Sequence, residues 1–165
     1  MDNLVIFLAT YVYLFEICIM LLYFSVQSRN TQKSFILLSV IFFPLAYIIA
    51  QIIAVFYFDP RPFVIGNFTP LISHAPDNGF PSDHMLLTST IASILCVYNK
   101  KIGIVAWIIA LVVGLSRVYA GIHHLTDIIG SIVVSIVSIW IVRRYILPKV
   151  FKTKLYRRYF KIEMI

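Results

Sequence analysis

The segment LVIFLATYVYLFEICIMLLYFSV, from Leu4 to Val26, is almost wholly apolar and contains a single charged residue, Glu16. About 17–25 predominantly apolar residues are enough to cross the hydrocarbon core of a membrane as a helix. Four comparable segments follow it: 35–58, 85–98, 102–115 and 128–142. The segment 85–98 reaches spanning length only if residues 82–84 begin its helix. The sequence therefore predicts an all-α, polytopic transmembrane helix bundle with about five spans.

The composition of the whole chain supports this prediction. Of its 165 residues, 61% are apolar and only 13% are charged, whereas a soluble domain averages roughly half apolar and a quarter charged. This excludes a soluble globular domain, a disordered tail and a disulfide-rich secreted protein. We expect one integral membrane domain over 1–165. Cys18 and Cys96 lie in apolar runs and are expected to be small buried hydrophobes, not a disulfide or metal pair.

The distribution of lysine and arginine predicts the orientation in the membrane. Twelve of the fourteen lie between the first and second spans, between the third and fourth, or after the fifth. Positive residues favour the cytoplasmic side, which places the N-terminus outside and the C-terminus in the cytoplasm of a multi-pass cell membrane protein. The basic segment 143–165 is then a cytoplasmic tail against the anionic inner leaflet. A nucleic acid partner is not expected, and no feature predicts an oligomeric state.

Two segments on the opposite, extracytoplasmic side carry nearly all the remaining polar chemistry. They are DPRPFVIGNFTPLISHAPDNGFPSDH, residues 59–84, and SRVYAGIHHLTD, residues 116–127. Together they hold the two other arginines, all four histidines and four of the seven acidic residues. Polar residues concentrated at one face of an apolar bundle indicate a functional site.

The residue types in these segments suit a phosphate. Arg61 and Arg117 can hold phosphate oxygens through forked hydrogen bonds. Ser82 and Asp83 stand where the third helix would begin, and free amides at a helix start favour an anion. His84 follows at once and is expected to donate a proton to a leaving oxygen.

A second pair supplies the nucleophile. His123 and Asp127 are four residues apart, one helical turn, so the carboxylate can hold one imidazole nitrogen and leave the other free to attack. The pattern predicts phosphoryl transfer through a phosphohistidine without a metal or cofactor. Metal catalysis is the rival, but His-Glu-x-x-His and Cys-x-x-Cys spacings are absent. His124 is adjacent to His123 and should point away from it.

The segments Arg61-Pro62, Pro81-Ser82-Asp83-His84 and Ser116-Arg117-x5-His123-x3-Asp127 resemble the three signature motifs of the type-2 phosphatidic acid phosphatase superfamily. Within it, the sequences around Arg61 and His84 look most like the undecaprenyl-diphosphate phosphatase branch. The resemblance implies the following roles: His123 attacks phosphorus, Asp127 orients it, His84 protonates the leaving group, and Arg61, Ser82, Arg117 and the backbone amide of Asp83 bind the phosphate.

The chain departs from the family pattern at two positions. The lysine that usually precedes the arginine by seven residues is replaced by Ala54, so one phosphate ligand is missing. His74 is one candidate to replace it, or the site uses fewer positive charges. Asp83 stands where the broad family has glycine, and its carboxylate must turn away from the phosphate, pair with Arg61 or be protonated.

The expected reaction is hydrolysis of a polyprenyl diphosphate to the monophosphate, with inorganic phosphate released on the outer side. Phosphatidic acid or phosphatidylglycerophosphate is the alternative substrate. A lipid-phosphate binder or scramblase without hydrolysis is the alternative from a different class. His74 and Asp77 belong to either a solvated turn or an entrance lid, and Glu16 faces the bundle, with Tyr47 as a possible partner, or stays protonated.

Overall fold

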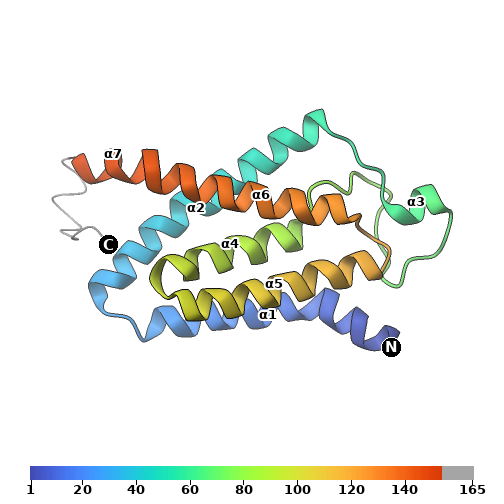
Figure 1. Ribbon diagram of the computed structural model, residues 1–165, viewed down its shortest axis with the longest axis horizontal. Helices are drawn as coiled ribbons and strands as arrows, with labels where there is room; N and C mark the ends of the chain where they lie inside the picture. Colours follow the sequence, from blue (N-terminus) through green and yellow to red (C-terminus); the bar gives the residue numbers. More distant parts are fainter. Residues whose placement is uncertain (154–165) are drawn as a thin grey trace.

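The computed structural model describes residues 1–153, which form a bundle of helices (Figure 1). Among those residues there is no β-strand, only an isolated bridge between Pro60 and Asn78. The predicted all-α class is confirmed. The helices are α1 (Asp2–Ser25), α2 (Arg29–Phe56), α3 (Pro62–Gly66), α4 (Asp83–Tyr98), α5 (Lys100–Tyr119), α6 (Leu125–Ile141), the π-helical η1 (Val142–Ile146) and α7 (Leu147–Lys152).

Four helical runs within the described residues are long and apolar enough to cross a membrane. They are α1, α2, α5 and the continuous run Leu125–Lys152. The fifth apolar segment is α4, whose 16 residues span about 24 Å, less than the roughly 30 Å of a typical hydrocarbon core. The prediction of about five apolar helices is confirmed, and the shortest of them begins at Asp83, within the second motif.

Polar caps explain two helix starts that the apolar runs alone did not predict. The hydroxyl of Ser28 accepts a hydrogen bond from the backbone of Thr31, so α2 begins six residues before the expected Phe35. The side chain of Asn99 accepts from two backbone amides in the first turn of α5. Such caps satisfy amides that have no partner inside a helix.

The short helix α4 is the centre of the bundle. It lies between α5 and α6 in Figure 1 and also contacts α1 and α2. Met85, Ile91 and Leu95 are fully buried, and Ser93 shares a hydrogen bond of 3.0 Å with the hydroxyl of Ser135 on α6. Because neighbours surround α4, its first turn is held firmly at one end of the bundle.

Three expectations about individual residues need correction or completion. Glu16 faces the bundle and is fully buried, but neither carboxyl oxygen has a hydrogen-bond partner among the described residues. Its suggested partner Tyr47 is instead 56% exposed. The two cysteines are free, as expected, yet Cys18 is exposed on the outer face of α1, because a small apolar residue can equally well face lipid.

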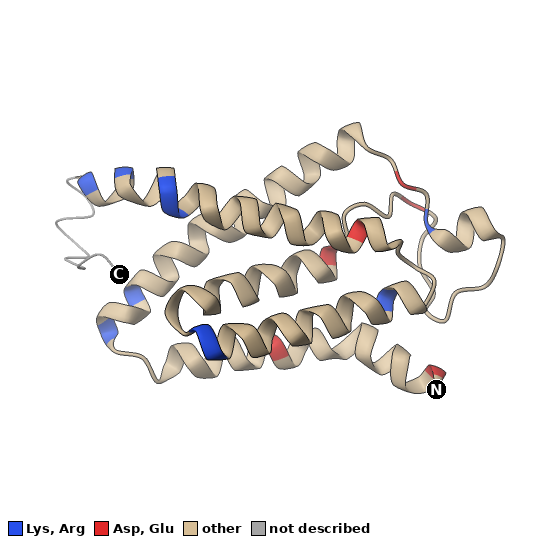
Figure 2. Cartoon of the chain, in the orientation of Figure 1, with Lys and Arg blue, Asp and Glu red and all other residues tan. Residues whose placement is uncertain are grey.

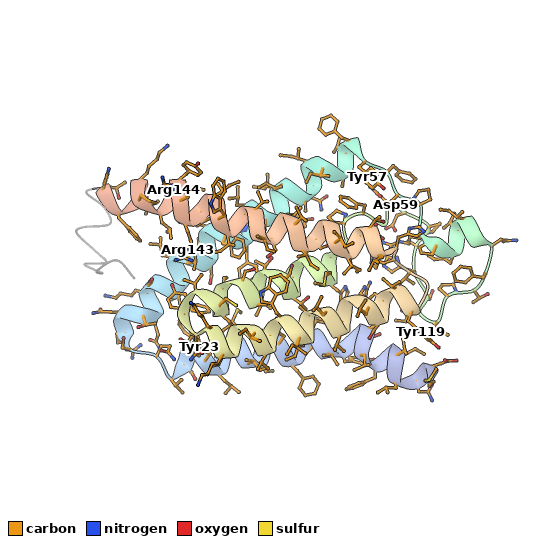
Figure 3. The ribbon with its side chains drawn as sticks, viewed as in Figure 1. Tyr23, Tyr57, Asp59, Tyr119, Arg143 and Arg144 are labelled. Carbon is orange, nitrogen blue, oxygen red and sulfur yellow. The ribbon has the colours of Figure 1, made fainter. Side chains whose placement is uncertain are left out.

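Apart from Glu16, in the middle of α1, the charged residues gather toward the two ends of the bundle (Figure 2). Figure 3 places Arg143 and Arg144 at the end opposite to Asp59. The basic residues at the end that holds Arg143 and Arg144 come from α2, α5, η1 and α7. They are Arg29, Lys33, Lys100, Lys101, Arg143, Arg144, Lys149 and Lys152. The predicted tail beyond residue 153 lies outside the described residues. The other end holds both remaining arginines of the described chain and the motif loops.

Candidate active site

The third motif runs from the end of α5 to the start of α6. After α5 the chain turns at Gly121, whose φ of +76° suits glycine, and His123 follows in the link before α6. His124 is the N-cap residue of α6. The side chain of Asp127, in the first turn, reaches back toward this link.

Asp127 joins the two histidines through one oxygen. Its Oδ2 lies 3.1 Å from Nδ1 of His123 and accepts the backbone N–H of His124 at 2.9 Å. The expected His123–Asp127 contact is therefore present, but not as one turn of a helix, because His123 precedes α6. Asp127 is fully buried and His123 is 2% exposed.

The pairing with Asp127 leaves Nε2 of His123 as the outward-facing nitrogen. With Nδ1–H donating to the carboxylate, Nε2 carries a free lone pair. NH1 of Arg61 lies 3.4 Å from this Nε2 and donates to the carbonyl of Ile122 at 2.8 Å. Burial, together with the charges of Arg117 and Arg61, lowers the pKa of His123 despite the opposing effect of its hydrogen bond to Asp127. The ring is thus held neutral and able to act as a nucleophile.

The second motif lies at the start of α4. Ser82 is its N-cap residue and is fully buried, and its hydroxyl has no hydrogen-bond partner among the described residues. The backbone carbonyl of Ser82 accepts a hydrogen bond of 2.9 Å from the hydroxyl of Ser131 on α6. The backbone N–H of Ser82 donates to the carbonyl of Asp127 at 3.4 Å. These bonds connect the start of α4 directly to α6, the helix whose Asp127 contacts His123.

His84 and Asp83 point in different directions from this turn. The ring of His84 packs edge-on against Tyr13 of α1, with centroids 4.9 Å apart, and interacts electrostatically with His123 and Arg117. Asp83 is exposed and lines a groove between α2 and α4. Among the described residues the ion pair of Arg61 is with Asp77 and not with Asp83, although Asp83 interacts electrostatically with Arg117. The backbone amide of Asp83 opens the first turn of α4 and is available to an anion.

The two arginines come from different elements, Arg61 from the start of α3 and Arg117 from the last turn of α5. Arg61 and Arg117 are each 5% exposed, and NH1 of Arg117 donates to the carbonyl of Ala9 on α1 at 3.1 Å. Nε of Arg117 is buried and has no hydrogen-bond partner in the described part of the chain. Such an unpaired cationic donor is costly unless an anion binds it.

The loop of residues 67–81 contributes groups that the motifs do not include. Nε of Arg61 donates to Asp77 at 2.6 Å, and the ring of His74 lies 6.4 Å from that of His123. The side-chain amide of Asn78 donates to the carbonyl of Ala54 at 3.2 Å, at the position where the family lysine is missing. Only His74 and Asp77 had a signal in the sequence, a histidine and an acid in the loop before the second motif.

Three side chains of the described residues could together hold a cation. One ligand atom from each of Asp59, His124 and Asp127 lies within 4.8 Å of the others. Nδ1 of His124 is 3.3 Å from Asp59, which also accepts from the hydroxyl of Thr126 at 3.1 Å. Figure 3 places Asp59 beside the start of α6. His124 connects the loop after α2 to the start of α6.

Comparison with known proteins gives a consistent result. The model of the PAP2 superfamily matches residues 33–151. The chain is 33% identical to Undecaprenyl-diphosphatase BcrC of Bacillus subtilis (strain 168) over 83% of this chain and 70% of that protein. It is 29% identical to the Bacitracin transport permease protein BcrC of Bacillus licheniformis over 84% of this chain and 68% of the relative.

A solved structure shares the fold. The crystal structure of a transmembrane PAP2-type phosphatidylglycerolphosphate phosphatase from Bacillus subtilis aligns with a TM-score of 0.60 and 23% identity, covering 93% of this chain and 77% of the other. The segment that the PAP2 superfamily model matches, residues 33–151, contains all three motifs. The family resemblance that the motifs indicated is confirmed. The chain belongs to the PAP2 superfamily and is an enzyme of the phosphatase class.

Proposed function

We propose that this protein is a membrane lipid phosphatase that hydrolyses a polyprenyl diphosphate to the monophosphate. The observation that carries the proposal is the buried His123, whose Nδ1 lies 3.1 Å from Asp127 and whose Nε2 lies 3.4 Å from Arg61. A neutral histidine with a fixed tautomer beside a cation is suited to attack a phosphoryl group. The similarity to Undecaprenyl-diphosphatase BcrC supports the diphosphate as substrate.

The reaction follows in two steps. Nε2 of His123 attacks the terminal phosphorus, the bond from phosphorus to the bridging oxygen breaks, and His84 gives its proton to the departing lipid monophosphate. Water then attacks the phosphohistidine, His84 takes a proton from that water, and the N–P bond breaks to release inorganic phosphate. Each step needs one proton transfer and no metal ion.

The proposed phosphate ligands come from all three motifs. Arg117 offers its unpartnered Nε, Ser82 its unpartnered hydroxyl, and the amide of Asp83 opens the first turn of α4. Preorganised donors aimed at developing negative charge stabilise a transition state without further rearrangement. Arg61 adds its positive charge next to Nε2.

The groove between α2 and α4 suits the lipid tail. Its volume is about 210 Å³, and it is lined almost wholly by apolar side chains next to the start of α4: Phe43, Ala46, Tyr47, Asp83, Leu86, Leu87 and Thr90. A substrate that enters sideways from the membrane can keep its tail here while its headgroup reaches the arginines. The apolar groove thus favours binding of a lipid over binding of a soluble phosphate ester, which has no apolar tail to bury.

We further propose that the site faces the extracytoplasmic side of the cell membrane. The basic residues gather at the end of the bundle opposite to the site (Figure 2), and such residues favour the cytoplasm. A cysteine at Asn67, in the loop at the site end, should react with an impermeant thiol reagent added to intact cells. Reaction only after lysis would reverse the orientation.

Phosphate release from three lipids tests the proposed substrate. Purified protein in detergent is given a polyprenyl diphosphate, phosphatidic acid or phosphatidylglycerophosphate at equal concentration. The proposal expects the largest kcat/KM for the diphosphate. A larger value for either of the other lipids would transfer the same chemistry to that substrate, and binding of all three without release would favour a binder or scramblase.

A further inference from the structure

The loop of residues 67–81 is fixed over the site by hydrogen bonds near both of its ends. Near its start, the N–H of Leu71 donates to the carbonyl of Ala120 at 3.0 Å. Near its end, Asn78 donates to the carbonyls of Ala54 and Tyr57, and Gly79 donates to Asp59 at 2.8 Å. The residues between these contacts are therefore held against the motif loops.

His74 lies between those fixed points, with its ring beside the nucleophile. The two rings stand edge to face, with centroids 6.4 Å apart, and the side chain of His74 is 26% exposed. Its Nδ1 lies 3.3 Å from the carbonyl of Ala75 and 3.8 Å from Asp77. These acceptors favour a proton on Nδ1, and Nε2 has no hydrogen-bond partner among the described residues.

Much of the hydrogen-bonding capacity of Arg61 is used within the protein. Its Nε donates to Asp77 and its NH1 to the carbonyl of Ile122. Its NH2 lies 3.5 Å from the carbonyl of Asn78. Arg61 therefore holds the loop in place. Because few of its N–H groups are left to bind phosphate, it contributes to phosphate binding mainly through its positive charge. Ala54 supplies no cation in place of the family lysine, so a further charged donor would add to the free donors of Arg117 and Ser82.

The surroundings of the His74 ring disfavour its protonated form. Burial and the charge of Arg61 lower its pKa, with a smaller effect from Arg117, and these outweigh the opposing effects of the Ala75 carbonyl and Asp77. A phosphate group adds two negative charges near the ring and reverses this balance. The other titratable groups that face the same space are His84 and His123.

We propose that His74 is a phosphate-binding residue that takes up a proton when the substrate binds, so that its Nε2–H donates a hydrogen bond to the phosphate that His123 attacks. The proton comes from solvent and returns to it when phosphate leaves. The site thereby gains a positive charge only when phosphate binds, in a chain that has Ala54 instead of the family lysine. This inference rests on the proposed phosphatase function.

Steady-state kinetics of phosphate release from the polyprenyl diphosphate test the assignment. In His74→Ala, KM should rise about tenfold or more at pH 6, as expected for a lost charge-assisted hydrogen bond, while kcat falls less than threefold. His74→Gln, which can still donate a neutral hydrogen bond, should recover part of the loss. Ser73→Ala, an exposed neighbour in the same loop, should match the wild type.

Binding of inorganic phosphate gives a readout that does not depend on turnover. Calorimetry in two buffers of different ionisation enthalpy measures the protons taken up on binding, and wild type should take up more than His74→Ala near pH 7. Equal proton uptake, an unchanged KM, or a loss confined to kcat would overturn the proposal. If wild type binds phosphate with the expected uptake but hydrolyses no lipid, the proposed function fails while the role of His74 in phosphate binding stands.

Discussion

Replacing Asp127 with asparagine tests how the nucleophile is held. One carboxylate oxygen, Oδ2, serves both Nδ1 of His123 and the backbone N–H of His124. An amide can supply only one oxygen, and the backbone N–H of His124 can be satisfied only by an acceptor. The asparagine oxygen should therefore take the place of Oδ2, and the NH2 group should take the place of Oδ1, which has no hydrogen-bond partner among the described residues.

In that orientation Asp127→Asn keeps the tautomer of His123 and loses only the negative charge. A hydrogen bond to a charged group contributes about 1.5–3 kcal/mol, so kcat should fall roughly 10- to 150-fold. Where an Asp→Asn change stabilises the wrong histidine tautomer, the loss is nearer 10⁴-fold. Asp127→Ala removes both hydrogen bonds and should cost considerably more activity, together with about 1 kcal/mol of helix-cap stability.

The assay is phosphate release from the lipid substrate by purified variants in detergent, with thermal unfolding as the control for folding. A 10⁴-fold loss in Asp127→Asn, equal to that of Asp127→Ala, would show that the amide adopts the other orientation. A loss below threefold would show that the carboxylate does not support the nucleophile. Either result would refute the reasoning.

Three other predictions concern the pH dependence of activity, the packing of α4 against α5, and the buried carboxyl of Glu16. Because the pKa of His123 is lowered and its neutral form is the proposed nucleophile, kcat/KM should stay high down to a pH below 6.5 and fall only in more acidic buffer; a fall that begins above pH 7 would contradict this. A Cβ on Gly103 would overlap the backbone of Cys96, so Gly103→Ala should destabilise α4–α5 packing by about 1–3 kcal/mol, measured by thermal unfolding, whereas Ile104→Ala on the exposed face should have little effect. Glu16→Leu removes a buried carboxyl without a partner and should raise the unfolding temperature, since such a group costs about 1–3 kcal/mol; a lower temperature would indicate an important partner.

The helices and the three motifs could be predicted because their signals are local. A run of apolar residues specifies a span wherever its neighbours lie, and the start of α4 at Asp83 follows from the motif residues that precede the apolar segment. The helix boundaries that differed, such as the start of α2 at Arg29, depend on a single capping side chain. The π-helical turn Val142–Ile146 had no recognisable signal.

The candidate site was predictable in its members but not in its geometry. The spacing of His123 and Asp127 indicated a contact, yet the histidine lies outside the helix and the aspartate reaches back to it. The surroundings of the Asp83 side chain depend on how α4 packs against its neighbouring helices, and the sequence around Asp83 does not specify that packing. Asp77 became part of the site through the fixed loop that brings it to Arg61, a long-range contact with no sequence pattern of its own.

His123 is proposed to form a covalent phosphoryl intermediate without a metal. The most direct test uses a polyprenyl diphosphate labelled at its terminal phosphate, with purified protein, excess chelator and rapid quenching. We predict labelled inorganic phosphate and a transient acid-labile label on the protein, both absent in a folded His123→Ala variant. Release that continues in His123→Ala, or that stops with chelator and returns with a divalent ion, would contradict the account.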